Sequence, residues 1–219
     1  MGDVFFDATV WRKALAQRLR SEGVAIDYPT LCRRWEAKLV DVYLGRRKYW
    51  DAFREFLGHL GLDEARAAKV LAFARETAAA VENRVLFDGV AETLARLKAA
   101  GLRLAVLSDT ESREPRVRQR LAQLGIEAHF DAVVSSVDIG HVKPERQAFT
   151  AALARLGVPA AETLFVSHDG DELQGAKRAG LTTVAYNYSE PVPADHHIRH
   201  FSELLGLAGA AGRGEQEAG

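Results

Sequence analysis

The pattern of apolar and polar positions divides the chain into two regimes. Between residues 12 and 82, apolar residues recur at spacings of three and four, a period that is typical of amphipathic helices. The pattern runs through four segments, "WRKALAQRLRSEG", "YPTLCRRWEAKLVDVYLG", "KYWDAFREFLGHLG" and "DEARAAKVLAFARETAAAVEN". Gly23, Gly45 and Gly61 separate these segments. Residues 12–82 therefore predict an all-helical insert of about four helices.

From Phe87 onward the pattern changes to an alternation of strands and helices. Short apolar runs that predict strands ("LRLAVLS", "FDAVVSS", "TLFVS", "LTTVAYN") alternate with helical segments of ten or more residues. Such strands indicate a parallel sheet that is covered on both faces, and right-handed crossovers then give a doubly wound α/β fold. Residues 3–7 read as one more short buried strand, which we expect to join this sheet.

These patterns predict a division of the chain into domains. Residues 1–11 and 83–206 form the α/β core, and residues 12–82 form a helical domain over the carboxyl ends of the strands. Residues 207–219 have no periodic apolar pattern and are expected to be a disordered tail.

Composition narrows the class of protein. The 219 residues are 47% hydrophobic, and 29 basic against 30 acidic residues give a net charge of −1, which favours neither a nucleic-acid partner nor an anionic membrane. Cys32 is the only cysteine, so the chain can form no internal disulfide, as expected of a cytoplasmic protein. No apolar run approaches the ~20 residues of a membrane span, and the first residues do not resemble a signal peptide.

Polar side chains follow the predicted strands. Asp7-Ala8-Thr9 ends the first strand, Ser108-Asp109-Thr110 ends the second, Lys143-Pro144 follows the third, and the acidic stretch 168–172 follows the fourth. Ligands of such sheets bind at the carboxyl ends of the strands. A carboxylate can attack phosphorus, a hydroxyl and an ammonium can hold phosphoryl oxygens, and acidic residues can hold Mg²⁺. The sequence therefore predicts a phosphate-handling site.

The motifs at these strand ends resemble those of the haloacid dehalogenase superfamily. "VFFDAT", "LAVLSDT", "HVKPERQAF" and "TLFVSHDGDELQGAKRAGL" are similar to its four motifs in the same order, and "LFDGVAETLARLKAAG" resembles its re-entry segment after a helical cap. The resemblance covers about residues 3–206 and implies a Rossmann-like core with an inserted helical cap.

The resemblance also implies roles for particular residues. Asp7 would be the nucleophile, with Thr9, Ser108 and Lys143 as the other catalytic residues. Ser108, Asp109 and Lys143 would bind a small phosphorylated metabolite, and we expect Arg46 of the helical domain to contribute to specificity for it. The metal, Mg²⁺ or Mn²⁺, would be held by a set drawn from Asp7, Thr9, His168, Asp169 and Glu172. The protein would act as a monomer or homodimer through an aspartyl-phosphate.

Two positions depart from the family pattern. Thr9 stands where most hydrolytic members have a second Asp that acts as general acid and base, and a hydroxyl does this poorly near neutral pH. His168 stands where the main metal-binding Asp is expected, and imidazole is a poor Mg²⁺ ligand. Asp169 could replace it if the loop shifts by one residue.

These departures leave three functions open. The first is a phosphatase or phosphotransferase, slowed by Thr9. The second is a catalytically degenerate protein of the same fold that binds a phosphometabolite or a partner. The third is a 2-haloacid dehalogenase-like hydrolase, in which the acidic loop would have no evident purpose. The stretch "DHHIRH" at 195–200 lacks the spacing of a zinc site and is expected to be a solvated loop.

Overall fold

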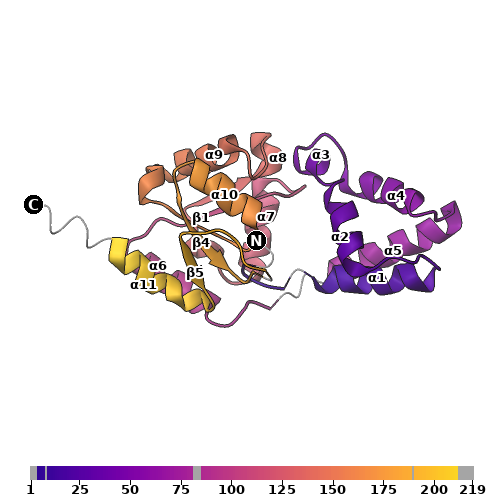
Figure 1. Cartoon of the computed structure of the whole chain (residues 1–219), viewed down its shortest axis with the longest axis horizontal. Helices are drawn as coiled ribbons and strands as arrows, with labels where there is room; N and C mark the ends of the chain where they lie inside the picture. Colours follow the sequence, from indigo (N-terminus) through magenta and orange to yellow (C-terminus); the bar gives the residue numbers. More distant parts are fainter. Residues whose placement is uncertain (1–3, 8, 81–84, 189, 212–219) are drawn as a thin grey trace, which may run out of the picture.

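A computed structural model describes residues 4–7, 9–80, 85–188 and 190–211. The chain forms two units, which lie side by side in Figure 1. We call residues 10–80 the helical unit and the remaining described residues the α/β unit.

The helical unit contains α1 (Val10–Ser21), α2 (Tyr28–Glu36), α3 (Val40–Tyr43), α4 (Tyr49–His59) and α5 (Glu64–Ala80). It has a hydrophobic cluster of its own, in which Trp35, Phe53 and Phe56 pack against one another with ring centroids 5.2 to 6.4 Å apart. The helical period of the sequence is confirmed, since the described residues between Val10 and Ala80 form no strand. The segment predicted as one helix over 28–45 is divided into α2 and α3.

The α/β unit is built on parallel strands. β1 (Ala105–Ser108) pairs with β2 (Ala132–Ser135), and β3 (Leu164–Ser167) pairs with β4 (Thr182–Tyr186), which pairs with β5 (His196–Ile198). The strands alternate with α6 (Val90–Ala99), α7 (Glu114–Gln123), α8 (Ser136–Ile139), α9 (Arg146–Leu156) and α10 (Gly170–Arg178), and α11 (Leu204–Ala211) follows β5. Short 3₁₀ turns lie at Glu127–His129, Ala160–Glu162 and Phe201–Glu203. The predicted α/β class with a parallel sheet is confirmed.

Helices cover both faces of the strands. α9 and α10 lie on one side, where Phe149 and Ala176 pack with Leu107 and Phe165. α6 and α11 lie on the other side (Figure 1), where the largest cluster of the unit is buried. This two-sided cover explains why the strands are almost continuously apolar in the sequence.

In this structure the described residues 4–7 are not paired with the strands of the sheet, which differs from the expectation for residues 3–7. Phe6 forms a single antiparallel bridge with Leu86, and the Phe87 N–H donates to the carbonyl of Phe5 over 2.8 Å. Phe5 and Phe6 are buried, so their apolar character predicted burial correctly but not the pairing partner. Asp3 lies outside the described residues.

Two shorter predictions need correction, and one short helix was not predicted. His196–Ile198, expected to be loop, forms β5, because Asp195 fixes its start by accepting hydrogen bonds from the backbone N–H and hydroxyl of Thr183 on β4. Residues 207–211, expected to be tail, continue α11, since Leu204 is buried and Leu205 and Leu207 pack against the same core. α8, which the sequence pattern did not predict, is a single turn directly after β2.

Candidate functional site

The carboxyl ends of the strands bring Lys143, Asp109 and Glu172 together. The Lys143 Nζ lies 3.2 Å from Asp109 Oδ2 and 3.4 Å from Glu172 Oε1. The Lys143 backbone N–H also faces the Asp109 carboxylate, at 3.2 and 3.3 Å from its two oxygens. The Lys143 side chain is only 6% exposed. One buried ammonium thus lies between two carboxylates that come from different strand ends.

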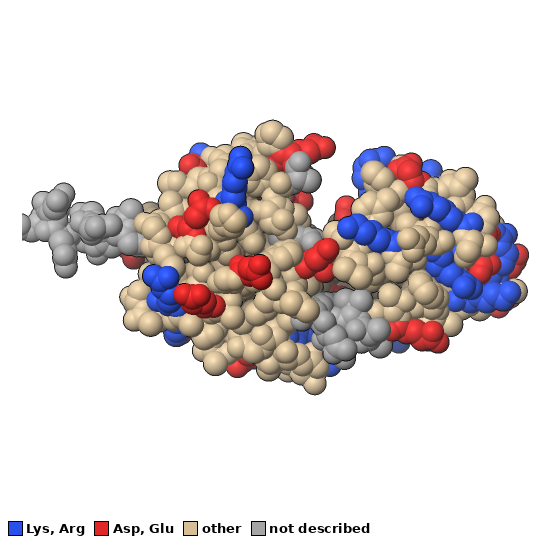
Figure 2. All heavy atoms as spheres, turned by 90° about the horizontal axis from the view of Figure 1, so that it is seen from below, with Lys and Arg blue, Asp and Glu red and all other residues tan. Residues whose placement is uncertain are grey.

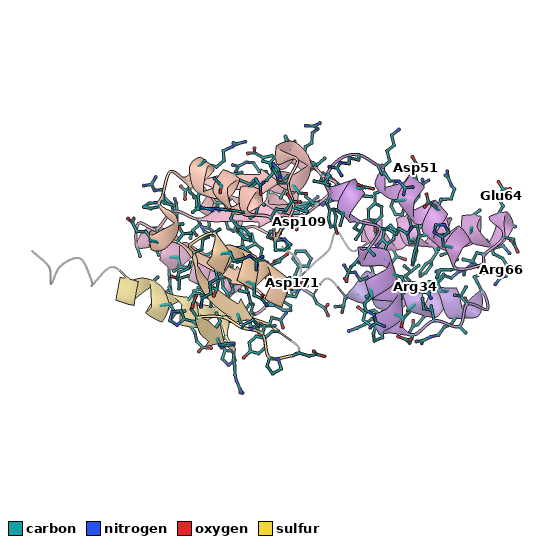
Figure 3. The ribbon with its side chains drawn as sticks, turned by 45° about the horizontal axis from the view of Figure 1, so that its top comes forward. Arg34, Asp51, Glu64, Arg66, Asp109 and Asp171 are labelled. Atoms are coloured by element: carbon teal, nitrogen blue, oxygen red, sulfur yellow. The ribbon has the colours of Figure 1, made fainter. Side chains whose placement is uncertain are left out.

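Local structure explains how each of these groups is placed. Asp109 follows β1 directly, and Glu172 lies in the first turn of α10, whose N-cap Asp169 accepts hydrogen bonds from the N–H groups of Asp171 and Glu172. Ser167, the last residue of β3, donates from its hydroxyl to Glu172 over 2.6 Å. Figure 3 labels Asp109 and Asp171, and both lie at the side of the α/β unit that faces the helical unit.

Gly175 allows Lys143 to reach this cluster. A Cβ at position 175 would lie 2.6 Å from the Cβ of Pro144 and 2.7 Å from its carbonyl oxygen, so any side chain would push α10 away from the turn that carries Lys143. The Gly-Ala pair of the fourth motif therefore has a packing role. It holds the lysine turn against the helix that supplies Glu172.

The electrostatics of the cluster keep the lysine charged. Burial works to lower the pKa of Lys143, but Glu172 and Asp109 outweigh it, and the pKa lies above the usual lysine value. Burial works to raise the pKa of Glu172. The charge of Lys143 and the hydrogen bond from Ser167 lower it by more, so this carboxyl group stays ionised. For Asp109, burial raises the pKa by more than the charge of Lys143 lowers it, so the pKa lies above the usual value.

Asp7 is not part of this cluster in the structure. Its side chain is exposed, and its Oδ1 accepts hydrogen bonds from both the backbone N–H and the hydroxyl of Thr9, each over 2.7 Å. The hydrogen bond from the Thr9 side chain is the main reason that the pKa of Asp7 is lowered. Among the described residues, the ion pairs of Lys143 are with Asp109 and Glu172 and not with Asp7.

The other predicted site residues are distributed around this centre. Ser108 is buried at the end of β1, in register with Ser135 of β2. His168 and Glu172 border a cavity, and Asp169 caps α10. Arg46 lies apart from the cluster on the helical unit, where it is exposed and pairs with Asp41 at 3.3 Å. No group of three His, Cys, Asp or Glu side chains among the described residues is arranged to hold a metal ion.

A cavity of about 460 Å³ separates β1 from β3. Its walls come from both strands, including Val106 and Leu107 on one side and Phe165 and Val166 on the other, and Val4 and Phe5 also line it. The cavity is also lined by polar residues at the carboxyl ends of the strands or in the segments that follow them: Lys143, Ser167, His168 and Glu172. Within the described residues each of the two strands is paired along one edge only, so the edges that face the cavity are free.

The helical unit meets the α/β unit just beyond β2. The hydroxyl of Ser136 donates to the carbonyl of Tyr43 over 2.8 Å and accepts from the Thr110 N–H over 3.0 Å. Burial raises the pKa of Tyr43 well above its usual value, so its phenol remains a hydrogen-bond donor at ordinary pH. Sequence reasoning missed Ser136, which carries no motif, although its position after a predicted strand is where polar contacts are expected. Figure 2 shows a hollow between the two units.

Three comparisons relate the chain to known proteins. A family model described as haloacid dehalogenase-like hydrolase matches residues 3–180. A phosphoglycolate phosphatase from Yersinia pestis is 29% identical over 218 residues, which cover 94% of this chain and 88% of that protein. The pyrophosphatase PpaX from Halalkalibacterium halodurans is 27% identical over 161 residues, covering 69% of this chain and 74% of that protein.

Solved structures agree on the fold. The hydrolase YfnB from Bacillus subtilis, bound to magnesium, has a TM-score of 0.70 at 18% identity and covers 95% of this chain and 96% of its own. A dehalogenase with an intermediate complex has a TM-score of 0.69 at 23% identity, covering 93% and 92% of the two chains. No helix among the described residues is long and apolar enough to cross a membrane. The match over residues 3–180 establishes that the chain belongs to the haloacid dehalogenase-like hydrolase family.

Proposed function

We propose that this protein hydrolyses a small phosphomonoester through an aspartyl-phosphate on Asp7. The observation that carries this proposal is the cluster of Lys143, Asp109 and Glu172 at the strand ends, with Ser108 buried at the end of β1. A buried lysine that stays charged can hold a phosphoryl oxygen, and the Ser108 hydroxyl can hold another. Relatives that are named as a phosphoglycolate phosphatase and a pyrophosphatase support phosphate chemistry.

The proposal requires Asp7 to approach Lys143. We infer that residues 4–7 pair between β1 and β3, in the cavity that Val4 and Phe5 already line. A strand in this position would satisfy the free edges of both neighbours, and its apolar side chains would fill a largely apolar space. If it ran parallel to β1 and β3, its carboxyl end would place Asp7 beside Lys143. The rearrangement would break the Phe6–Leu86 bridge and the hydrogen bond from Phe87 to Phe5.

The reaction then has two steps. An oxygen of the Asp7 carboxylate attacks phosphorus and the bond to the ester oxygen breaks, so that the leaving alkoxide takes a proton and departs as the alcohol. Water next attacks phosphorus, breaks the bond to Asp7, and releases inorganic phosphate and the free carboxylate. Lys143 and Ser108 stabilise the charge on the phosphoryl oxygens in both steps. Solvent is the proposed proton source, since Thr9 is a weak acid.

We further propose that Mg²⁺ binds once Asp7 is in place. Three carboxylates around one lysine would repel a phosphate, and a divalent cation would offset that charge. Asp7 and Glu172 would be its oxygen ligands, with His168 and Asp169 beside them. The helical unit would serve as the cap that closes over the site, and residues 1–11 with 83–206 would serve as the core.

Turnover of an aryl phosphate with Mg²⁺ or Mn²⁺ tests the proposal, with Asp7→Asn as the control. Metal-dependent turnover that the substitution abolishes is the expected result. Binding of a phosphometabolite without turnover would favour the degenerate alternative. Release of chloride from a 2-haloacid in the presence of EDTA would favour the dehalogenase alternative, which needs no metal. The fold alone does not separate this alternative from a phosphatase, because the chain is similar both to a dehalogenase structure and to the hydrolase YfnB.

A further inference from the structure

Arg12 has a donor group that the described residues leave unused. Its Nη1 donates to Glu36 on α2 over 2.7 Å, and its side chain is 26% exposed. Its Nε, in contrast, is buried and has no hydrogen-bond partner among the described residues. Buried polar groups nearly always have a partner, so an unused donor on a charged side chain indicates a site for a ligand or a water molecule.

Arg12 lies in the part of the helical unit that is nearest to Asp7 in the chain. It is in the first turn of α1, whose N-cap is Thr9, the residue that holds the Asp7 carboxylate. At 1.5 Å per residue, Arg12 is only about 4.5 Å along the helix axis from Thr9. Arg12 is therefore the arginine of α1 that is nearest to Asp7 along the helix axis.

Tyr43 links Arg12 to the loop that follows β1. Burial raises the pKa of its phenol most, and the charges of Arg12, Glu111 and Asp109 also act on that pKa. Its carbonyl accepts the hydrogen bond from Ser136 that joins the two units. Arg12 thus belongs to the side of the helical unit that meets the strand ends.

We propose that Arg12 recognises a carboxylate on the substrate, a few bonds away from the phosphoryl group. This inference rests on the proposed function and names the class of substrate, a phosphomonoester with a carboxylate in its alcohol part. The guanidinium fork suits a carboxylate, which can accept two parallel N–H bonds. Glu36 is 51% exposed, so it can leave the guanidinium when such a ligand binds.

Arg18 provides a matched control on the same helix. Its Nε is also buried without a partner, and its Nη2 pairs with Glu22 at 2.8 Å. However, Arg18 lies near the other end of α1, where its guanidinium stacks 5.8 Å from the centroid of the Phe73 ring. If Arg12 only joined two helices, its replacement would leave the preference between substrates unchanged, as we expect for replacement of Arg18.

The experiment compares 2-phosphoglycolate with ethyl phosphate, which has a methyl group in place of the carboxylate. For each variant the ratio of kcat/KM between the two substrates is measured. Arg12→Lys keeps the charge but loses the fork, and we expect the ratio to fall by about 10- to 100-fold. Arg18→Lys should leave the ratio unchanged. An equal ratio in Arg12→Lys and the wild type would overturn the inference.

A binding measurement separates this inference from the proposed function. The Asp7→Asn protein is titrated calorimetrically with each compound, with and without Arg12→Lys, so that no turnover is needed. Preferential binding of 2-phosphoglycolate that Arg12→Lys removes would support the Arg12 site even if the wild type proves inactive. Equal binding of the two compounds to the Asp7→Asn protein would overturn it.

Glu36→Gln, which frees the guanidinium, should tighten binding of 2-phosphoglycolate by about 2- to 5-fold. Weaker binding would contradict the proposed role of Arg12.

Discussion

At the scale of single residues, Lys143 is the side chain on which the candidate site depends. It is nearly buried and is the cation between Asp109 and Glu172. Its replacement leaves two neighbouring carboxylates without a counter-charge, which destabilises a folded protein more than the loss of a surface pair. We expect Lys143→Met to lower the free energy of unfolding by about 2–3 kcal/mol, because both carboxylates keep some access to water. Denaturant unfolding measures this change.

The same variant should lose activity. A donor that stabilises a phosphoryl oxygen in the transition state is worth about 100-fold or more in turnover. Lys177→Met is the control, since Lys177 pairs with Asp195 and not with Asp109 or Glu172, and its side chain is 63% exposed. Retention of wild-type turnover by Lys143→Met would remove the lysine from the proposed mechanism.

Thr9 provides a test of the general acid. Its hydroxyl and N–H both bind Asp7, so a carboxyl group at position 9 would lie beside the Asp7 carboxylate. A neighbouring negative charge raises the pKa of a carboxyl group, which favours the protonated form that a leaving group needs. We expect Thr9→Asp to raise turnover of an aryl phosphate, whereas Thr9→Ala should change it little. Lower turnover of the Asp variant, with an unchanged circular dichroism spectrum, would count against this role for position 9.

At the scale of elements, the sequence predicted the strands but not all of their neighbours. "LAVLS" and "TLFVS" are apolar runs of the right length, and both form strands in the structure. "VFF" has the same apolar character, yet the backbone of residues 4–7 bonds to Leu86 and Phe87 and forms no ladder with β1 or β3. Apolar character predicts that a segment is buried; it does not specify which strand edge the segment pairs with.

The proposed position of residues 4–7 has a consequence for hydrogen exchange. Addition of Mg²⁺ and beryllofluoride should slow amide exchange in residues 4–7, and at the cavity-facing edges of β1 and β3, because these N–H groups would gain partners. β4 is the internal control, since it is already paired on both sides, with β3 and β5. Slower exchange in β4 alone, or in none of these strands, would argue against pairing of residues 4–7 with the sheet.

Asp195 gives a pH-dependent test of how β5 is attached. It accepts hydrogen bonds from Lys177 and from the N–H and hydroxyl of Thr183, and these lower its pKa, with Lys177 as the largest cause. A lowered pKa in the folded state stabilises the protein above the unfolded value of about 3.9. This stabilisation is lost as the pH falls toward the folded pKa.

We therefore expect Asp195→Asn to cost on the order of 1 kcal/mol at pH 7, since the carboxylate is partly exposed. The difference from the wild type should shrink as the pH falls below about 4. Denaturant unfolding at several pH values measures this difference. A difference that stays constant down to pH 2 would show that the charge of Asp195 does not contribute.

At the scale of the whole molecule, the periodicity of the sequence predicted the helical insert, but not how it meets the rest of the chain. The hydrogen bond from Ser136 to Tyr43 joins residues 93 positions apart, and no local pattern marks either of them. The same limit applies to Arg12, which reads as an ordinary residue of an amphipathic helix. The motifs predicted which residues form the strand-end cluster. Only the structure shows that Lys143 pairs with both Asp109 and Glu172.

The central claim is that Asp7 is the nucleophile and acts beside Lys143. A crystal structure with Mg²⁺ and beryllofluoride, which mimics an aspartyl-phosphate, tests this claim most directly. We expect the adduct on Asp7, with the beryllofluoride within about 4 Å of the Lys143 Nζ, the reach of an ion pair. An Asp7 that carries no adduct and remains bound to Thr9 alone, in crystals that contain both ligands, would contradict the account.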